Sequence, residues 1–120
     1  GEIRDRQTAR AVLTAALSGH LVLSTLHATS AYGVIERLAD LGITWSELES
    51  VLQLVSYQRL LPLKSKSQAV LFDIIQQDEL FSANVERANS GMSADWGRYL
   101  EQNATKGKIT VATAKKFVYG

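Results

Sequence analysis

The segment His20-Leu21-Val22-Leu23-Ser24-Thr25-Leu26-His27 decides the fold of this 120-residue chain. Its apolar residues fall on both alternating faces, and a histidine stands at each end. A short run of this kind is typical of a strand that is buried on both faces of a parallel α/β sheet. The segment therefore predicts an α/β fold that has a core strand here.

Helical patterns surround this segment. Residues 6–18 carry apolar residues at spacings of three and four, and Asp5 is placed to cap that helix. Ser30 is placed to cap a second helix that ends near residue 41. Residues 44–47, Thr-Trp-Ser-Glu, match a capping box, so we expect a third helix to begin there.

The second half of the chain predicts a hairpin followed by helices. Residues 57–63 and 69–75 are strand-like, and the polar residues 64–67 join them. Pro62 has no amide hydrogen, so its strand is expected to lie at an edge or to end there. Three further helices are expected, over residues 78–89, 93–103 and 110–119.

Composition excludes several classes of protein. Hydrophobic residues make up 46% of the chain and charged residues 21%, which is typical of a folded domain. No apolar run is long enough for a membrane-spanning helix. Cysteine is absent, which excludes disulfides and cysteine-based metal sites. The net charge of +1 predicts no bulk attraction to nucleic acid or to anionic membranes.

Acidic and histidine side chains are the first candidates for chemistry. Glu2 lies beside Arg4 and Asp5 at the head of the first helix, and catalytic carboxylates in α/β folds follow strands. The alternative is that these charges only stabilise the helix terminus. His20 and His27 could form a relay for an anion or a proton, bind a metal together with Glu2 and Asp5, or simply join elements.

Other patterns are less specific. Ser24 and Thr25 lack a G-x-S-x-G context, which argues against a serine hydrolase. Trp45, Trp96 and Tyr99 serve either as core residues or as anchors of a docking surface. The sequence contains no G-x-x-x-x-G-K-[ST] loop, which ATP binding by backbone amides and a lysine would require.

Two motifs nevertheless occur in a telling order. Residues 1–5 are Gly-Glu-Ile-Arg-Asp, and residues 18–28 are Ser-Gly-His-Leu-Val-Leu-Ser-Thr-Leu-His-Ala. Residues 37–42, Arg-Leu-Ala-Asp-Leu-Gly, follow. Over residues 1–63 this pattern resembles the secretion ATPases, the motors of type II secretion, type IV pilus and competence pseudopilus assembly. The first motif resembles the end of their Walker B motif, and the second resembles their His box.

The resemblance implies roles for individual residues. Glu2 matches the acidic Walker B residue that helps to position Mg²⁺ and the attacking water, and His27 matches the His-box histidine that faces the nucleotide. These two are the expected catalytic residues. Arg4 within the Walker B signature, His20 at the start of the His box and Arg59 in Gln58-Arg59-Leu60 are the expected nucleotide-binding residues.

The resemblance also implies an architecture and a setting. We expect the mostly helical C-terminal part of a RecA-like P-loop ATPase domain, with the core portion at residues 1–63, a hairpin and helical region at 64–120, and the P-loop upstream of Gly1. The cofactors would be ATP and Mg²⁺. Many family members carry a four-cysteine zinc site. This chain has no cysteine, so no zinc is expected. In this respect the chain resembles the competence-type members of Gram-positive bacteria.

The family further implies a hexamer that is peripheral to the cytoplasmic face of the membrane. Its expected partners are an inner-membrane platform protein and pseudopilins, with no direct contact to nucleic acid. By itself the chain is expected to be inactive and to dimerise. The alternative is a non-catalytic module that docks on a platform protein through Trp45, Trp96 and Tyr99.

Overall fold

A long antiparallel hairpin organises the molecule. In the computed structural model, which describes residues 1–82 and 92–120, strand β1 (Leu54–Pro62) pairs with β2 (Gln68–Gln76). The register runs from Leu54 opposite Gln76 to Pro62 opposite Gln68. The hairpin prediction is confirmed, although β1 begins before the predicted residue 57 and ends one residue before 63, and β2 extends one residue beyond 69–75 at each end. Pro62 ends its strand, because it has no amide hydrogen to donate.

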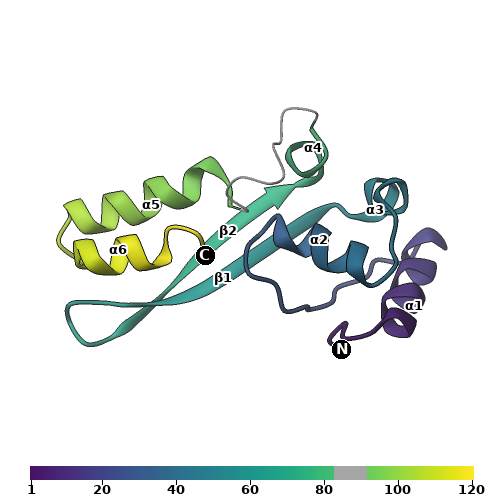
Figure 1. The fold of residues 1–120 in the computed structure, drawn as a ribbon, viewed down its shortest axis with the longest axis horizontal. Helices are drawn as coiled ribbons and strands as arrows, with labels where there is room; N and C mark the ends of the chain where they lie inside the picture. The colour runs from purple at the N-terminus through teal and green to yellow at the C-terminus, as the bar shows by residue number, and fades with distance from the viewer. Residues whose placement is uncertain (83–91) are drawn as a thin grey trace.

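Helices cover the two ends of this hairpin. Figure 1 shows α1 (Arg6–Leu17), α2 (Gly33–Asp40) and α3 (Trp45–Val51) beside the end where β1 begins. The helices α5 (Ala94–Thr105) and α6 (Val111–Phe117) lie along the end with the hairpin loop, and the short α4 (Gln77–Leu80) follows β2. The helices expected over 93–103 and 110–119 are therefore confirmed as α5 and α6. The helix expected over 78–89 is present only as α4 among the described residues, and residues 83–89 lie outside them.

Helix capping follows local chemistry. The Asp5 carboxylate accepts a hydrogen bond from the Thr8 amide at 2.7 Å, which confirms it as the cap of α1. Thr44 and Glu47 form the reciprocal capping box of α3. The expectation for Ser30 was wrong, because α2 begins only at Gly33. The Ser30 hydroxyl accepts from the Gly33 amide at 3.0 Å, so it stabilises the turn before the helix.

The segment from His20 to His27 differs from its prediction. Its backbone joins another segment at one isolated parallel bridge, between Thr25 and Glu2, instead of forming a core strand. The side chains of Leu21 and Leu23 are 87% and 85% exposed. A strand is buried on both faces only when neighbouring strands and helices flank it, and the described residues supply a neighbour at one point only. The fold is therefore helical with a two-stranded hairpin.

The inner face of the hairpin contacts two hydrophobic clusters. The first joins α1, α2 and α3 to Val55 and Ile75. The second joins α5 and α6 to Leu61. Tyr57 packs against both clusters. Trp96 is 0% exposed, and its indole N–H donates to the Phe117 carbonyl oxygen at 2.8 Å. Trp96 is thus a core residue and not an anchor of a docking surface.

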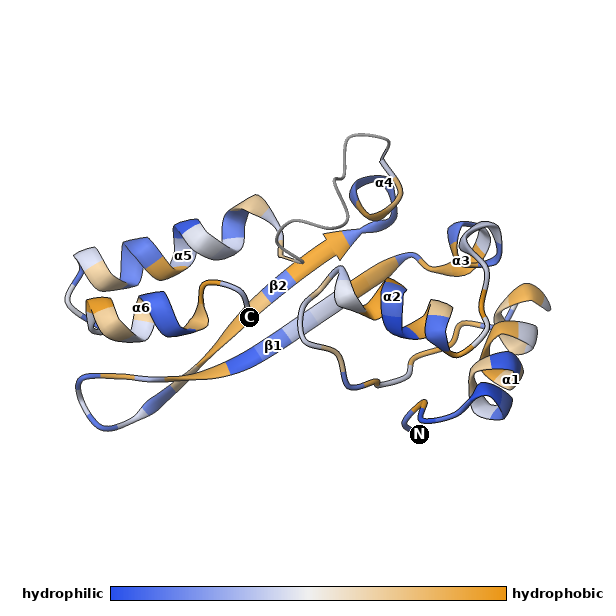
Figure 2. Ribbon diagram, in the orientation of Figure 1, coloured by the Kyte–Doolittle hydropathy of each residue, from blue (hydrophilic) through white to orange (hydrophobic). Residues whose placement is uncertain are grey.

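The outer face of the hairpin is apolar and exposed. Residues at alternate positions of both strands share this face, because successive side chains of a strand point to opposite sides. Figure 2 shows the hydrophobic residues along β2. The exposed large apolar residues of this outer face are Leu54, Leu60, Val70, Phe72 and Ile74.

Candidate functional site

The bridge at Thr25 brings Glu2 and His27 together. The Ile3 amide donates to the Thr25 carbonyl oxygen at 2.8 Å, which aligns residues 2–3 with the segment that ends in His27. The His27 Nε2 atom lies 3.0 Å from Glu2 Oε1. Two residues that are 25 positions apart in the sequence therefore form a carboxylate–imidazole pair on the surface.

Arg4 contacts the other oxygen of the same carboxylate. Its Nε atom donates to Glu2 Oε2 at 2.8 Å, and its Nη2 atom lies 2.7 Å from that oxygen. This is a forked contact of the guanidinium, which is a strong and directional way to hold a carboxylate. Glu2 is half-buried, whereas the side chains of Arg4 and His27 are exposed. The carboxylate is thus held from both sides while its partners face solvent.

This arrangement defines what the cluster of Glu2, Arg4 and His27 can do. Glu2 Oε1 has one protein contact, His27, and keeps a lone pair for a water molecule or a further ligand, whereas both Arg4 nitrogens contact Oε2. Among the described residues no group of three or more acidic or histidine side chains could hold a metal ion. Magnesium sites, however, often use only one or two carboxylates together with waters and substrate phosphates. Glu2 therefore fits a single contribution to such a site or the orientation of a water.

Ser24 secures the start of the chain beside this cluster. Its hydroxyl donates to the Gly1 carbonyl oxygen at 2.6 Å. Because the hydroxyl spans the two segments, it supports the register that places Glu2 opposite Thr25. Sequence reasoning considered Ser24 only as a nucleophile and missed this positioning contact. The available signal in the sequence was that two adjacent polar residues, Ser24 and Thr25, interrupt an otherwise apolar run.

His20 and Arg59 lie elsewhere. The His20 Nδ1 atom is 3.2 Å from the carbonyl oxygen of Ala15, so this histidine contacts the C-terminal end of α1. The Arg59 guanidinium carbon lies 4.9 Å from the ring centroid of Phe117, at the α6 end of the hairpin. The structure therefore brings together Glu2, Arg4 and His27 of the five expected site residues, and it places His20 and Arg59 in other surroundings.

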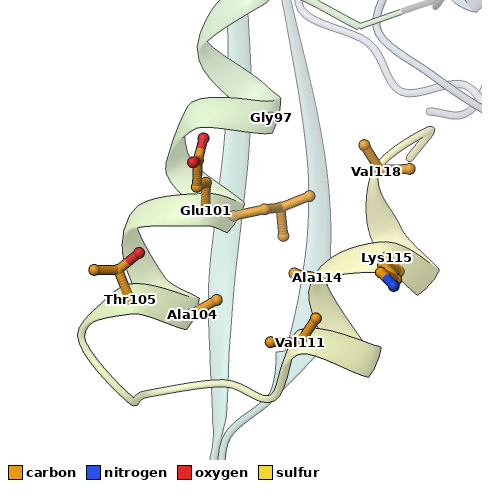
Figure 3. Close-up of a pocket in the computed structure, with 9 residues that line it drawn as sticks. Gly97, Glu101, Ala104, Thr105, Val111, Ala114, Lys115 and Val118 are labelled. Atoms are coloured by element: carbon orange, nitrogen blue, oxygen red, sulfur yellow. The ribbon is translucent and has the colours of Figure 1, made fainter.

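A groove lies between α5 and α6, away from the cluster of Glu2, Arg4 and His27. Figure 3 shows the residues that line it, among them Glu101 and Ala104 of α5, Val111 and Lys115 of α6, and Val118 just after α6. Its volume is about 470 Å³, and its lining is mainly apolar. Glu101 and Lys115 are the charged side chains that line it. This groove holds no arrangement of acids, histidines or nucleophiles, so it offers a contact surface and no evident catalytic chemistry.

One further structural finding concerns membranes. Among the described residues no helix is both long enough and apolar enough to cross a bilayer.

Comparisons with known proteins give the context of the cluster. The family model described as "Type II/IV secretion system protein" matches residues 1–113. Competence protein ComGA of Streptococcus pneumoniae is 59% identical over 61 residues, covering 51% of this chain and 20% of that protein. Type II secretion system protein E of Pseudomonas aeruginosa is 57% identical over 60 residues, covering 50% of this chain and 12% of that protein.

The fold is also similar to a solved motor structure. The pilus retraction motor PilT, solved with bound ADP, has a TM-score of 0.76 and 26% identity to this chain. The match covers 98% of this chain and 38% of the PilT chain. The chain thus spans a fifth or less of the two curated relatives above and well under half of this structure.

Proposed function

The chain belongs to the type II/IV secretion system protein family, and on that premise we propose that it is part of a RecA-like motor domain that hydrolyses ATP. The contact of Glu2 with His27 and Arg4 supports this proposal, because it holds in a fixed orientation the carboxylate that the resemblance matches to the Walker B acid. Similarity to competence proteins supports assembly of a competence pseudopilus as the specific task.

The residues of the cluster suit different parts of phosphoryl transfer. ATP with Mg²⁺ supplies the phosphoryl group and most of the local positive charge when bound. Glu2 would orient the attacking water through the free lone pair of Oε1 and would contribute to holding the metal's water shell. Arg4 and His27 would keep the Glu2 carboxylate in place, because each contacts a different oxygen of it. Such fixed positioning is where this class of enzyme gains most of its rate.

The remainder of the motor is proposed from the family. A P-loop in a part of the protein beyond these 120 residues would bind the phosphates, and residues 1–63 would complete the core while 64–120 form an appended region. The whole protein would act as a hexamer at the cytoplasmic face of the membrane, together with a platform protein and pseudopilins. Within that assembly, His20 and Arg59 remain proposed nucleotide-side residues, since a neighbouring subunit or domain could approach them.

A substitution of Glu2 tests the proposal. In the whole protein, Glu2→Gln should leave ATP affinity close to that of the native protein and lower the rate of phosphate release by about 100-fold or more, because the amide cannot take up a proton from water. Affinity is measured with a fluorescent ATP analogue, and turnover with a phosphate assay. The matched control is Glu36→Gln, the same change at an exposed position of α2. Turnover that is equal in both variants would exclude Glu2 from the reaction.

A further inference from the structure

All six lysines of the chain occur in two short segments. Lys64 and Lys66 stand in the hairpin loop, and the others are Lys106, Lys108, Lys115 and Lys116. No acidic residue occurs in residues 50–72 or 102–120. Residues 1–58, in contrast, carry four arginines and six acidic residues. The net charge of +1 therefore conceals a strong separation of charge along the chain.

The fold brings the two lysine segments to one end of the molecule. The Lys64 amide donates to the Lys108 carbonyl oxygen at 3.0 Å, so the hairpin loop contacts the loop between α5 and α6. On α6, the Lys116 Nζ atom lies 5.7 Å from the Phe117 ring centroid, and the same ring receives Arg59. All six lysines are exposed. We call this surface the basic end, and Figure 1 shows its two loops together at the end opposite α1.

The hairpin loop keeps one of these lysines at a conformational cost. The Lys66 amide donates to the Leu63 carbonyl oxygen, and the Leu63 amide donates to Ser67, which makes a tight turn. In this turn Lys66 has a φ of 66°, in the left-handed region. Glycine or asparagine adopts that conformation more readily than lysine. Unfavourable backbone geometry of this kind is common at functional positions, which favours a role for the Lys66 charge.

Exposed apolar side chains lie beside these cations. Val111, at the start of α6, is 65% exposed. Figure 3 shows Val111, Lys115 and Val118 on the side of α6 that lines the groove. Lysines combined with exposed valine side chains suit the surface of an anionic bilayer, where cations meet headgroups and apolar groups enter the boundary with the acyl chains. A nucleic acid would engage the lysines but would leave the valines without apolar contacts.

We propose that the basic end docks on a bilayer leaflet that contains anionic phospholipids. The inference deepens the proposed function, on which it rests for the presence of a membrane surface, by naming the part of the chain that would meet the lipid. Docking of the basic end depends on the charge of this surface and not on the binding or hydrolysis of nucleotide. Glu101 is the acidic residue that lines the groove, together with Lys115, and no acidic residue follows it in the sequence.

Vesicle sedimentation tests the proposal directly. The 120-residue chain is mixed with vesicles of phosphatidylcholine containing about 30% phosphatidylglycerol, and with pure phosphatidylcholine vesicles. We expect binding to the anionic vesicles, a strong reduction at about 0.5 M salt because the charges are then screened, and little binding to the neutral vesicles. Equal binding to both vesicles, or no binding to either, would overturn the proposal.

Matched substitutions locate the surface. Lys64→Gln combined with Lys108→Gln should weaken binding by about 10-fold or more, since each lysine near an anionic surface contributes about fivefold. Arg6→Gln combined with Arg37→Gln makes the same change of net charge at the other end and should leave binding unchanged. Circular dichroism checks that both variants fold. An equal loss in the two double variants would show that net charge, and not the basic end, governs binding, which would contradict the proposal.

Lys66→Gly separates the charge from the fold. Glycine relieves the left-handed strain, so this variant should unfold at the same or a higher temperature while it binds anionic vesicles about fivefold more weakly. If Lys66→Gly bound anionic vesicles as tightly as the native chain, Lys66 would not belong to the membrane-binding surface. Tighter binding of the native chain to duplex DNA than to anionic vesicles at equal salt would assign the basic end to nucleic acid instead. Glu2→Gln should bind vesicles as the native chain does, so the two proposals fail independently.

Discussion

Asp5 and Glu47 show how single carboxylates act at helix starts. The Thr8 amide donates to Asp5 and lowers the pKa of that carboxyl below its usual value. Arg10, followed by Thr44, hydrogen-bonds to Glu47 and lowers the pKa of Glu47. The Arg10 contact also joins α1 to α3. Both carboxylates favour the folded chain only while they are ionised.

Asp5 gives a pH-dependent prediction at this scale. Because its pKa is lower in the folded chain, its stabilisation is complete above the unfolded value of 3.8 and is lost as the pH falls below it. Asp5→Asn keeps an efficient cap that does not titrate. The melting temperature of the variant should therefore fall less steeply than that of the native chain below about pH 4. If the melting temperatures of Asp5→Asn and of the native chain fell equally steeply with pH, the ionised Asp5 would not contribute to the stability of the fold.

The hairpin and the α5–α6 pair depend on each other at the scale of elements. A single two-stranded hairpin is only marginally stable in water, so it needs helices against one face. Trp96 of α5 meets this need, since its ring packs edge-to-face against Tyr57 of β1 at a centroid distance of 5.6 Å. Asp73 of β2 adds a polar connection, because it accepts from the Ser93 amide at 2.8 Å just before α5.

Truncation of Trp96 should therefore destabilise the chain. Trp96→Ala removes a fully buried ring, and we expect its free energy of unfolding to fall by about 3–5 kcal/mol in urea titrations. Tyr99→Ala on the same helix is the matched control. Tyr99 is 37% exposed, so its truncation should lower the free energy of unfolding by less than the truncation of the fully buried Trp96 does. Similar losses for both variants would contradict the assignment of Trp96 to the core.

Besides the exposed side chains of α6 and the C-terminal residues, the described part of the molecule exposes two apolar surfaces. One is the extended segment with Leu21 and Leu23, and the other is the outer face of the hairpin. Contiguous exposed apolar residues and unpaired strand backbone favour association with another surface. Because the family's motor proteins are much longer than this chain, further parts of such a protein are the occupants that we propose for these surfaces.

This exposure predicts association of the isolated chain. Light scattering should show a mass that rises with protein concentration beyond the monomer mass of 13.2 kDa. Leu21→Ser combined with Leu23→Ser should shift that rise to higher concentration, because less apolar surface is available. The control is Val111→Ser combined with Val118→Ser on α6, which should leave the rise unchanged. A constant monomer mass at all concentrations would show that these surfaces do not self-associate.

The sequence by itself determined the local structure and the family. Capping by Asp5 and by Thr44 with Glu47 depends on residues three positions apart, and the hairpin depends on two apolar runs with a polar loop between them. Such short-range patterns can be read along the chain. The resemblance to Walker B and His-box motifs also predicted roles for Glu2 and His27, and the structure brings the two side chains into contact through the bridge at Thr25.

The tertiary structure alone decided which surfaces are covered and where the charges collect. The apolar pattern around Leu21 could not show that few of the described residues cover this segment, because burial depends on segments elsewhere in the protein. The charge count could not show the basic end, because Lys64 and Lys108 meet only when the hairpin folds onto the α5–α6 loop. Arg59 likewise stacks on Phe117, a residue far along the chain. Contacts between residues distant in sequence depend on how all the elements pack together, so they cannot be predicted from local sequence spacing.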